Sequence, residues 1–239
     1  MLNKNINSNE ILLLSLPVTP YSEVWDMQRS IFNKLVEGKS EDTLILCEHP
    51  PVYTLGRITE AANILFSDDE LVKIGAEKFE IERGGDVTFH GPGQLVGYPL
   101  LNLSHFKEDL GWYLRALEET IILTLAEYQI IGFRILGKTG VWVGEDGKEE
   151  KICAIGIKAS RWCTMHGFAF NVNTDLSYFE RIIPCGISDK DVTSLQKILG
   201  KEIEMQEVKE YYEKAFEKVF EVELRSIPTY QVASPAFVS

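Results

Sequence analysis

Three segments of the chain carry apolar residues at every third or fourth position, which is the spacing of an amphipathic helix. These segments predict helices over about residues 21–36, 109–128 and 205–219. Gly38 follows the first of them and is expected to end it, since glycine readily adopts the left-handed conformation found at helix C-termini.

Other parts of the chain show the patterns of strands. Residues 11–16 and 43–47 are continuous apolar runs, which are typical of buried strands. Segments rich in β-branched and aromatic residues predict further strands at 141–143, 151–158 and 164–172. The helices are too few and too irregularly placed for a doubly wound sheet. The pattern therefore favours an α+β fold, in which helices pack on a mixed, largely antiparallel sheet. No repeat, low-complexity segment or linker divides the chain, so residues 1–239 are expected to form a single domain.

The composition limits the partners of the protein. There are 24 Lys and Arg against 36 Asp and Glu, a formal net charge of −12, whereas binding to nucleic acid needs a basic face. The four cysteines are scattered without a C-x-x-C pair, which disfavours a zinc ribbon, a dithiol redox motif and a disulfide framework. The apolar run at 11–16 is too short to span a membrane, and the N-terminus lacks secretory or transit character. We therefore expect a cytoplasmic protein with reduced thiols that binds no metal, membrane or nucleic acid.

A glycine-rich segment gives the strongest single indication of a ligand site. It reads Arg83-Gly84-Gly85-Asp86-Val87-Thr88-Phe89-His90-Gly91-Pro92-Gly93-Gln94. Its glycines permit sharp bends on both sides of a short strand. In that strand Thr88 and His90 point to one side and Val87 and Phe89 to the other, which predicts a polar ledge with an apolar back beside a pocket. The alternative is an ordinary β-hairpin with a glycine-rich turn.

A second segment matches a phosphate-binding motif in its letters alone. It reads Gly132-Phe133-Arg134-Ile135-Leu136-Gly137-Lys138-Thr139, which fits the pattern G-x-x-x-x-G-K-[ST]. A phosphate loop needs a strand before it and a helix after it, whose N-terminal amides hold the phosphate. Here a predicted helix precedes the motif and a predicted strand follows it, so we do not expect a phosphate loop.

Two further segments carry reactive side chains. In Pro184-Cys185-Gly186 the proline and the glycine favour a tight bend that presents the thiol outward; a buried structural cysteine is the alternative. Lys151 opens a predicted strand whose middle is small and apolar. A lysine at a pocket edge can hold a nearby cysteine as its thiolate or exchange a proton with it, whereas an ordinary solvated lysine is the alternative.

Taken together, these segments resemble the lipoyl(octanoyl) transferase family. The matching stretches are residues 48–57, 83–94, 139–143, 151–158, 166–173 and 184–187, in the order of the family. The resemblance implies the fold of biotin and lipoate protein ligases, in one octanoyltransferase catalytic domain. It also implies a cysteine–lysine pair 34 positions apart, which is the separation of Cys185 and Lys151 (185 − 151 = 34).

The family's functional residues are expected at the matching positions. Cys185 is then the acyl-thioester nucleophile, and Lys151 is the acid and base that lowers the pKa of its thiol. The acyl pocket is expected to be formed by Arg83, Gly84, Gly85, Asp86, Val87, Thr88, Phe89, His90, Ala154, Ile155, Gly156, Gly167, Phe168 and Ala169. Cys153 and Cys163 lie outside the nucleophile motif and are interpreted as packing residues.

The resemblance implies an acyltransferase of lipoate biosynthesis that needs no cofactor. The octanoyl group comes from octanoyl-acyl carrier protein and goes to a lysine of the lipoyl domains of 2-oxoacid dehydrogenases and of the glycine cleavage H protein. A cysteine suits this ping-pong reaction, because its thiolate is both a nucleophile and a good leaving group. Since acyl carrier proteins are acidic, a local basic patch is expected near the pocket. The candidates are Arg57, Arg83, Lys158 and Arg161.

Three other functions compete with this interpretation. An ATP-dependent lipoate or biotin ligase of the same fold needs ATP and the free acid, and it needs no cysteine nucleophile. A catalytically silent acyl-binding module keeps fatty-acid binding when Cys185 is replaced by Ala. A phosphate-loop nucleotidase requires Lys138.

Overall fold

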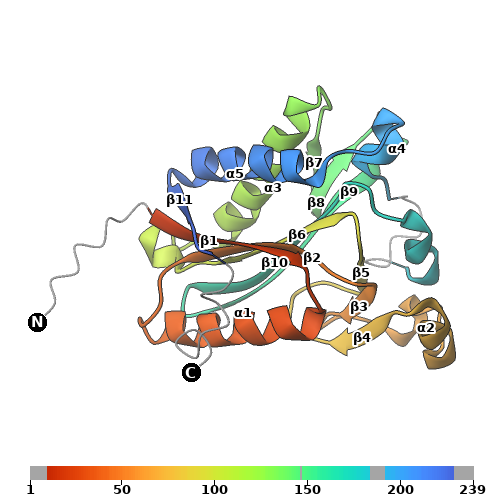
Figure 1. Cartoon of the computed structure of the whole chain (residues 1–239), viewed down its shortest axis with the longest axis horizontal. Coiled ribbons are helices and arrows are strands. Elements are labelled where there is room, and N and C mark those ends of the chain that lie inside the picture. Colours follow the sequence, from red (N-terminus) through yellow and green to blue (C-terminus); the bar gives the residue numbers. More distant parts are fainter. Residues whose placement is uncertain (1–9, 146, 184–191, 229–239) are drawn as a thin grey trace, which may run out of the picture.

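A twisted sheet of eight strands forms the centre of the computed structural model, which describes residues 10–145, 147–183 and 192–228 (Figure 1). Across the sheet the strands are β11 (Glu223–Ser226), β1 (Glu10–Val18), β2 (Thr43–Glu48), β6 (Gln94–Leu100), β10 (Cys163–Asn171), β9 (Glu150–Ser160), β8 (Lys138–Val143) and β7 (Phe133–Ile135). Strand β1 pairs in parallel with β11 and β2, and the other neighbours pair antiparallel. The predicted mixed, largely antiparallel sheet is confirmed.

Helices cover both faces of this sheet (Figure 1). Helix α1 (Tyr21–Val36) lies on one face and packs its apolar side into a cluster with β2 and β6. Helices α3 (Leu110–Glu127) and α5 (Met205–Phe220) lie side by side on the other face, over a core that includes Phe168 and Phe170 of β10. Asp109 caps α3, because its side chain accepts a hydrogen bond from the backbone N–H of Trp112 at 3.0 Å. All three predicted helices are therefore confirmed, together with the buried strands between them.

A smaller sheet lies beside the large one and carries the glycine-rich segment. It consists of β4 (Glu77–Glu80), β3 (Val52–Leu55) and β5 (Thr88–His90), in that order. Helix α2 (Asp68–Ile74) and the 3₁₀ helices η1 (Ala61–Asn63) and η3 (Leu176–Arg181) belong to this part of the chain, whereas η2 (Leu103–His105) and α4 (Leu195–Leu199) accompany the large sheet. A separate apolar cluster around Tyr53, Val87 and Phe179 holds the small sheet together. The short strand predicted in the glycine-rich segment is confirmed as β5, whereas the other short elements were not predicted.

The phosphate-loop letters form a β-hairpin. Strand β7 pairs antiparallel with β8, Ile135 faces Lys138, and Gly137 makes the turn with a φ of +77°. Helix α3 precedes the hairpin, so no helix N-terminus is offered to a phosphate. The prediction that this motif is not a phosphate loop is confirmed.

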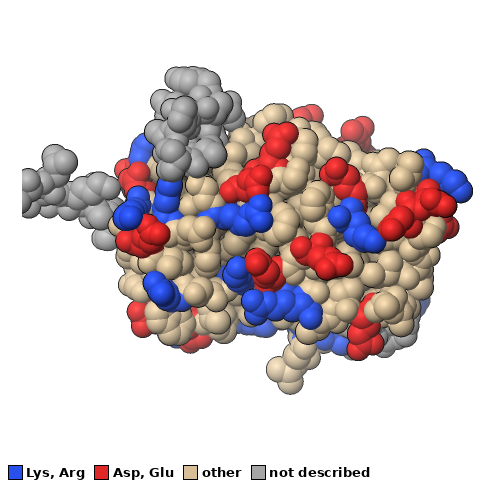
Figure 2. All heavy atoms as spheres, turned by 90° about the horizontal axis from the view of Figure 1, so that it is seen from below, with Lys and Arg blue, Asp and Glu red and all other residues tan. Residues whose placement is uncertain are grey.

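Within the described ranges, none of the helices is both long and apolar enough to cross a membrane. Basic and acidic side chains are interspersed on the face of the molecule shown in Figure 2, without a broad area of one sign. The predicted nucleophile Cys185, with the predicted bend at residues 184–186, lies outside the residues that the structure describes.

Candidate functional site

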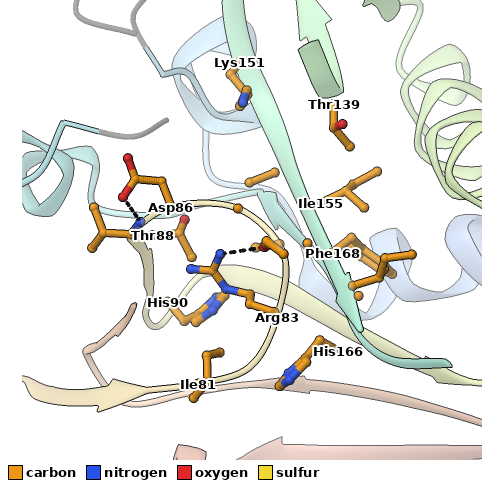
Figure 3. A pocket seen from close by; sticks show the side chains of 18 of the residues that line it. Ile81, Arg83, Asp86, Thr88, His90, Thr139, Lys151, Ile155, His166 and Phe168 are labelled. Atoms are coloured by element: carbon orange, nitrogen blue, oxygen red, sulfur yellow. Dashed lines mark hydrogen bonds between the residues drawn. The ribbon is translucent and has the colours of Figure 1, made fainter. Parts of the chain in front are cut away.

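A cavity of about 430 Å³ lies between the glycine-rich segment and the large sheet. One wall is the segment from Arg83 to His90, and the opposite wall is formed by β9 and β10 (Figure 3). Of the predicted pocket residues, thirteen line this cavity: Arg83, Gly84, Gly85, Asp86, Val87, Thr88, His90, Ala154, Ile155, Gly156, Gly167, Phe168 and Ala169. Lys151 lines it as well. The segment and the two strands, which are far apart in the sequence, therefore meet at one hollow.

Phe89 is the exception among the predicted pocket residues. Its ring belongs to the apolar cluster of the small sheet and stacks on Tyr178, with ring centroids 4.4 Å apart. The neighbouring Thr88 and His90 face the cavity, as alternation along a strand requires. The expectation that Phe89 lines the pocket was wrong, since the same alternation turns its side chain to the apolar back.

Glycine allows the two walls to approach closely. The backbone N–H of Gly84 donates to the carbonyl of Ile157 on β9 at 2.8 Å. A Cβ atom at Gly156 would lie 2.8 Å from the carbonyl oxygen of Gly84, closer than van der Waals contact permits. Gly85 has a φ of +92°, which glycine adopts without strain. These glycines therefore set the width of the cavity.

Arg83 and His90 are held by one buried hydrogen-bond network. The Arg83 guanidinium donates to the carbonyl of Thr54 at 2.7 Å and to its hydroxyl at 3.1 Å. That hydroxyl lies 3.4 Å from Nε2 of His90, whose Nδ1 lies 2.9 Å from Oε1 of Gln94. Burial is the main cause that lowers the pKa of His90 to about 3, so its ring is neutral near pH 7. The network orients polar groups along one wall of the cavity without leaving a titrating imidazole there.

The side chain of Asp86 stabilises the bend of the glycine-rich segment through hydrogen bonds. One carboxylate oxygen accepts from the backbone N–H of Val87 at 2.6 Å, and the other accepts from the side-chain amide of Asn63. Only 4% of Asp86 is exposed. Its role in the structure is to hold the bend, because its oxygens are engaged within the loop.

Lys151 is anchored through its backbone at one end of the cavity. Residues 151 and 192 form a parallel bridge, and the backbone N–H of Thr193 donates to the carbonyl of Lys151 at 3.0 Å. The side-chain amide of Asn171 in turn donates to the carbonyl of Thr193 at 3.0 Å. The Lys151 ammonium lies 4.7 Å from the centre of the Trp142 ring, within the range of a cation–π interaction. Val192, the first described residue after the segment containing Cys185, also lines the cavity.

The three cysteines in the described part of the chain are poor candidates for a nucleophile. Cys47, Cys153 and Cys163 are all buried free thiols, and none of them lines the cavity. Burial raises the pKa of each thiol above its ordinary value, and the thiolate is the reactive form. Cys153 and Cys163 thus pack in the interior, as expected. Cys185 itself lies outside the described residues.

The proposed basic patch is only partly exposed. Arg83 is buried against Thr54, and Lys158 pairs with Glu82 at 3.0 Å. Arg57 and Arg161 are exposed. Two of the four candidates for the basic patch, Arg83 and Lys158, therefore already interact with other residues of the chain.

Several cavity residues escaped the sequence analysis. Ile81 lies near His166 in Figure 3, and Tyr21, Thr139 and Asn171 also line the cavity. The apolar and helical patterns around Tyr21 and Ile81 identify these two residues only as core residues. The sequence did contain one indication of this part of the cavity, because His166 directly precedes Gly167 in a stretch that matches the family. Among the described residues, no group of three or more His, Cys, Asp or Glu is arranged to hold a metal ion.

Comparisons with known proteins agree with this architecture. A family model described as the lipoyl protein ligase A/B catalytic domain matches residues 20–217. The fold is also that of the bi-partite lipoate protein ligase of Thermoplasma acidophilum, with a TM-score of 0.69 at 16% identity, covering 96% of this chain and 91% of the other. The chain belongs to the lipoyl protein ligase A/B catalytic-domain family, and the expected lipoate-ligase fold is confirmed.

Within this family the chain is most informatively compared with octanoyltransferases. It is 47% identical over 240 residues to the octanoyltransferase of Cytophaga hutchinsonii, covering 94% of this chain and 98% of the relative. It is 51% identical over 197 residues to the octanoyltransferase of Bacteroides fragilis, covering 80% and 89% of the two chains. The resemblance stated from the residues is therefore confirmed.

Proposed function

We propose that the chain transfers an octanoyl group from octanoyl-acyl carrier protein to the lysine of a lipoyl domain, through a thioester on Cys185. About half of its residues are identical to those of octanoyltransferases along nearly the whole chain. The observation that carries the proposal in the structure is the apolar-walled cavity with Lys151 at one end. Burying an alkyl chain there is favourable by about 0.8 kcal/mol per CH₂ group.

The described neighbours of Cys185 support its part in the proposal. Residues 182 and 183 are tied to the small sheet, since Ile182 bridges Ile64 and the N–H of Ile183 donates to the carbonyl of Asn63 at 2.9 Å. Cys185 lies two residues after Ile183, which limits the separation of their Cα atoms to about 7 Å. On the other side of the segment, Val192 bridges Lys151. Val192 thus lines the cavity, and residues 182 and 183 are tied to the part of the chain that carries its glycine-rich wall.

The proposed reaction has two displacement steps. Neutral Lys151 takes the proton of the Cys185 thiol, and the thiolate sulfur attacks the carbonyl carbon of the octanoyl thioester. The carbon–sulfur bond to the carrier breaks, and the Lys151 ammonium returns the proton to the departing carrier thiolate. The amine of the acceptor lysine then attacks the acyl-enzyme carbonyl and passes a proton to Lys151. The bond to Cys185 breaks, the octanoyl amide leaves, and the Lys151 ammonium returns the proton to the Cys185 thiolate.

The partners and the compartment are part of the same proposal. The donor is an octanoyl-acyl carrier protein, and the acceptors are lipoyl domains of 2-oxoacid dehydrogenases and the glycine cleavage H protein. The buried free thiols at positions 47, 153 and 163 support a reducing compartment, the cytoplasm. No cofactor is needed, because the thioester is already activated.

An ATP-free transfer assay tests this function. We expect octanoyl to pass from octanoyl-acyl carrier protein to an apo-lipoyl domain without ATP, detected as the mass of the modified domain. Replacing Cys185 by Ser should abolish the transfer, whereas Cys163→Ser, a matched change at a buried thiol, should retain it. Modification that requires ATP and free octanoic acid would instead assign the chain to the ligases.

A further inference from the structure

The end of the cavity far from Lys151 is closed by an imidazole. His166 on β10 pairs with Ile157 on β9, six residues beyond Lys151. Six strand residues span about 20 Å, and Lys151 and His166 lie at opposite ends of the view in Figure 3. Both side chains line the cavity. The cavity is thus a slot that runs along β9 from an ammonium to an imidazole.

His166 has an unsatisfied hydrogen-bonding atom at this end. Only 2% of the residue is exposed, and its Nε2 has no hydrogen-bond partner within the described chain. The two other buried imidazoles differ in this respect. His49 lies 2.7 Å from the carbonyl of Thr19 and 2.8 Å from the hydroxyl of Tyr98, and both ring nitrogens of His90 also have partners. A buried polar atom without a partner is costly, and such atoms in a native structure call for an explanation.

The backbone of His166 shows that its position is enforced. Its φ is +63°, a conformation that a residue with a Cβ atom rarely adopts in the middle of a strand. The buried side chain of Gln28 on α1 accepts the backbone N–H of His166 at 3.1 Å. Strained residues of this kind cluster at ligand sites. Burial lowers the pKa of the ring to about 3, so the imidazole is neutral and one of its nitrogens can donate while the other accepts.

We infer that His166 makes the far end of the slot a hydrogen-bonding subsite, which takes an acyl chain with a hydroxyl group on its terminal carbon. This inference rests on the proposed function, in which the slot holds the acyl chain with its carbonyl near Lys151. An extended eight-carbon chain is about 9 Å long, from a C–C bond of about 1.5 Å. The side chains of Lys151 and His166 both line the slot and take up part of its remaining length, so we place the chain terminus at the imidazole. A hydroxyl suits Nε2 in either tautomer, since it both donates and accepts.

The position of the hydroxyl along the chain decides the expected preference. Near the middle of the slot the wall formed by β9 and β10 presents Ile155 and Phe168, whose side chains offer no hydrogen bond, and the Arg83 guanidinium on the opposite wall already donates to Thr54 and Gly84. An apolar wall of this kind disfavours an added hydroxyl by roughly tenfold or more. At the terminal carbon the bond to His166 removes that penalty. The subsite therefore distinguishes acyl chains by where they carry a hydroxyl.

The test compares three acyl groups on the same carrier protein with the full-length enzyme. These are octanoyl, 8-hydroxyoctanoyl and 5-hydroxyoctanoyl, and kcat/KM is measured for transfer to an apo-lipoyl domain. We expect 8-hydroxyoctanoyl to stay within about threefold of octanoyl, and 5-hydroxyoctanoyl to fall about tenfold or more below both. Equal values for the two hydroxylated chains, or a tenfold loss for 8-hydroxyoctanoyl, would overturn the inference. If octanoyl itself is not transferred, the proposed function fails instead.

Variants connect the preference to the imidazole. In His166→Leu the ratio of kcat/KM for 8-hydroxyoctanoyl to that for octanoyl should fall about tenfold. Phe168→Leu is the matched control, because it changes an apolar wall and should affect both substrates alike. If the leucine variant does not fold, His166→Asn replaces it, since asparagine tolerates the left-handed conformation and its shorter side chain does not reach the chain terminus. An unchanged ratio in the folded variant contradicts the inference.

Discussion

Lys151 combines two features that a proton carrier needs. Its backbone is fixed by the bridge to residue 192 and by the hydrogen bond from Thr193, while its ammonium lies over the Trp142 ring at the end of the slot. A lysine in a partly desolvated site can lose its proton near neutral pH, whereas an arginine cannot. In the proposed mechanism, the ability of this side chain to lose its proton therefore matters more than its charge.

Replacing Lys151 by Arg separates charge from proton transfer. The variant retains a cation near Trp142, but its guanidinium cannot act as a base. We expect the rate of octanoyl transfer near pH 7 to fall by about 10²-fold or more. Transfer should recover partly as the pH is raised, because the thiol of Cys185 then ionises without help. The measurement is the pH dependence of kcat/KM for both proteins. A variant with the wild-type rate and profile would remove Lys151 from the mechanism.

At the scale of single residues, the sequence predicted most of the slot, including Lys151 at one end, but not the end that contains His166. The matching stretches placed thirteen wall residues correctly in the cavity, because short motifs carry local backbone geometry with them. Phe89 was assigned wrongly, because the whole range 83–90 was assigned to the pocket although side chains alternate between the two sides of a strand. Tyr21 was missed, because a buried helix residue looks the same whether it faces a core or a cavity. The unsatisfied nitrogen of His166 became visible only with its surroundings.

At the scale of elements, the close contact between the glycine-rich segment and β9 sets the shape of the site. It depends on Gly156, whose neighbour across the gap is the backbone of Gly84. A backbone oxygen cannot move aside as a flexible side chain can. A methyl group at this position must therefore push the two walls apart.

The variant Gly156→Ala tests this contact. We expect a loss of about 1–3 kcal/mol in the free energy of unfolding and a larger loss in kcat/KM, because the slot is widened. Gly111→Ala is the matched control, since it adds the same methyl group in the exposed first turn of α3, where the nearest atom is the side-chain oxygen of Asp109 at 3.2 Å. The control should be neutral or slightly stabilising. Urea unfolding and steady-state kinetics provide both quantities. Equal behaviour of the two variants would show that the contact is not close in solution.

Long elements were predictable, and short connections were not. The three main helices and the strands β1, β2, β8, β9 and β10 of the large sheet carry residue patterns that could be recognised from the sequence alone, whereas β6 and β11 were not predicted. In contrast, β9 and β10 are joined at Arg161 and Trp162, both with positive φ. Hairpins of this type normally use Asn or Gly, so the residues at this turn do not indicate it. At this turn the pairing of β9 with β10 outweighs the preference of Arg161 and Trp162 for a negative φ.

At the scale of the whole molecule, three neutral histidines are buried near one another. Burial is the main cause that lowers the pKa of His49 to about 4, and of His90 and His166 to about 3. In the unfolded chain a histidine has a pKa of about 6.5. Between these values the unfolded state binds more protons, so the free energy of unfolding rises with pH. The stability due to the neutral rings is complete above about pH 6.5 and is lost as the pH falls towards their folded pKa values.

This linkage predicts how a histidine substitution changes the pH dependence of stability. Each ring contributes a slope of up to about 1.4 kcal/mol per pH unit between pH 6 and 5. In His90→Gln the slope should be smaller by roughly one such contribution. Tyr53→Phe removes a different buried hydrogen bond, to the carbonyl of Tyr178, and should lower stability without changing the slope. Urea unfolding from pH 5 to 6 measures both. A slope in His90→Gln equal to that of the control would contradict the buried neutral ring.

The central proposal, an octanoyl thioester on Cys185 formed with the help of Lys151, is tested most directly by intact mass spectrometry. The protein is incubated with octanoyl-acyl carrier protein in the absence of an acceptor domain. The account predicts one octanoyl adduct on the wild-type chain and on Cys163→Ser, and none on Cys185→Ser. An adduct that persists in Cys185→Ser, or that maps to one of the three buried thiols, would contradict it.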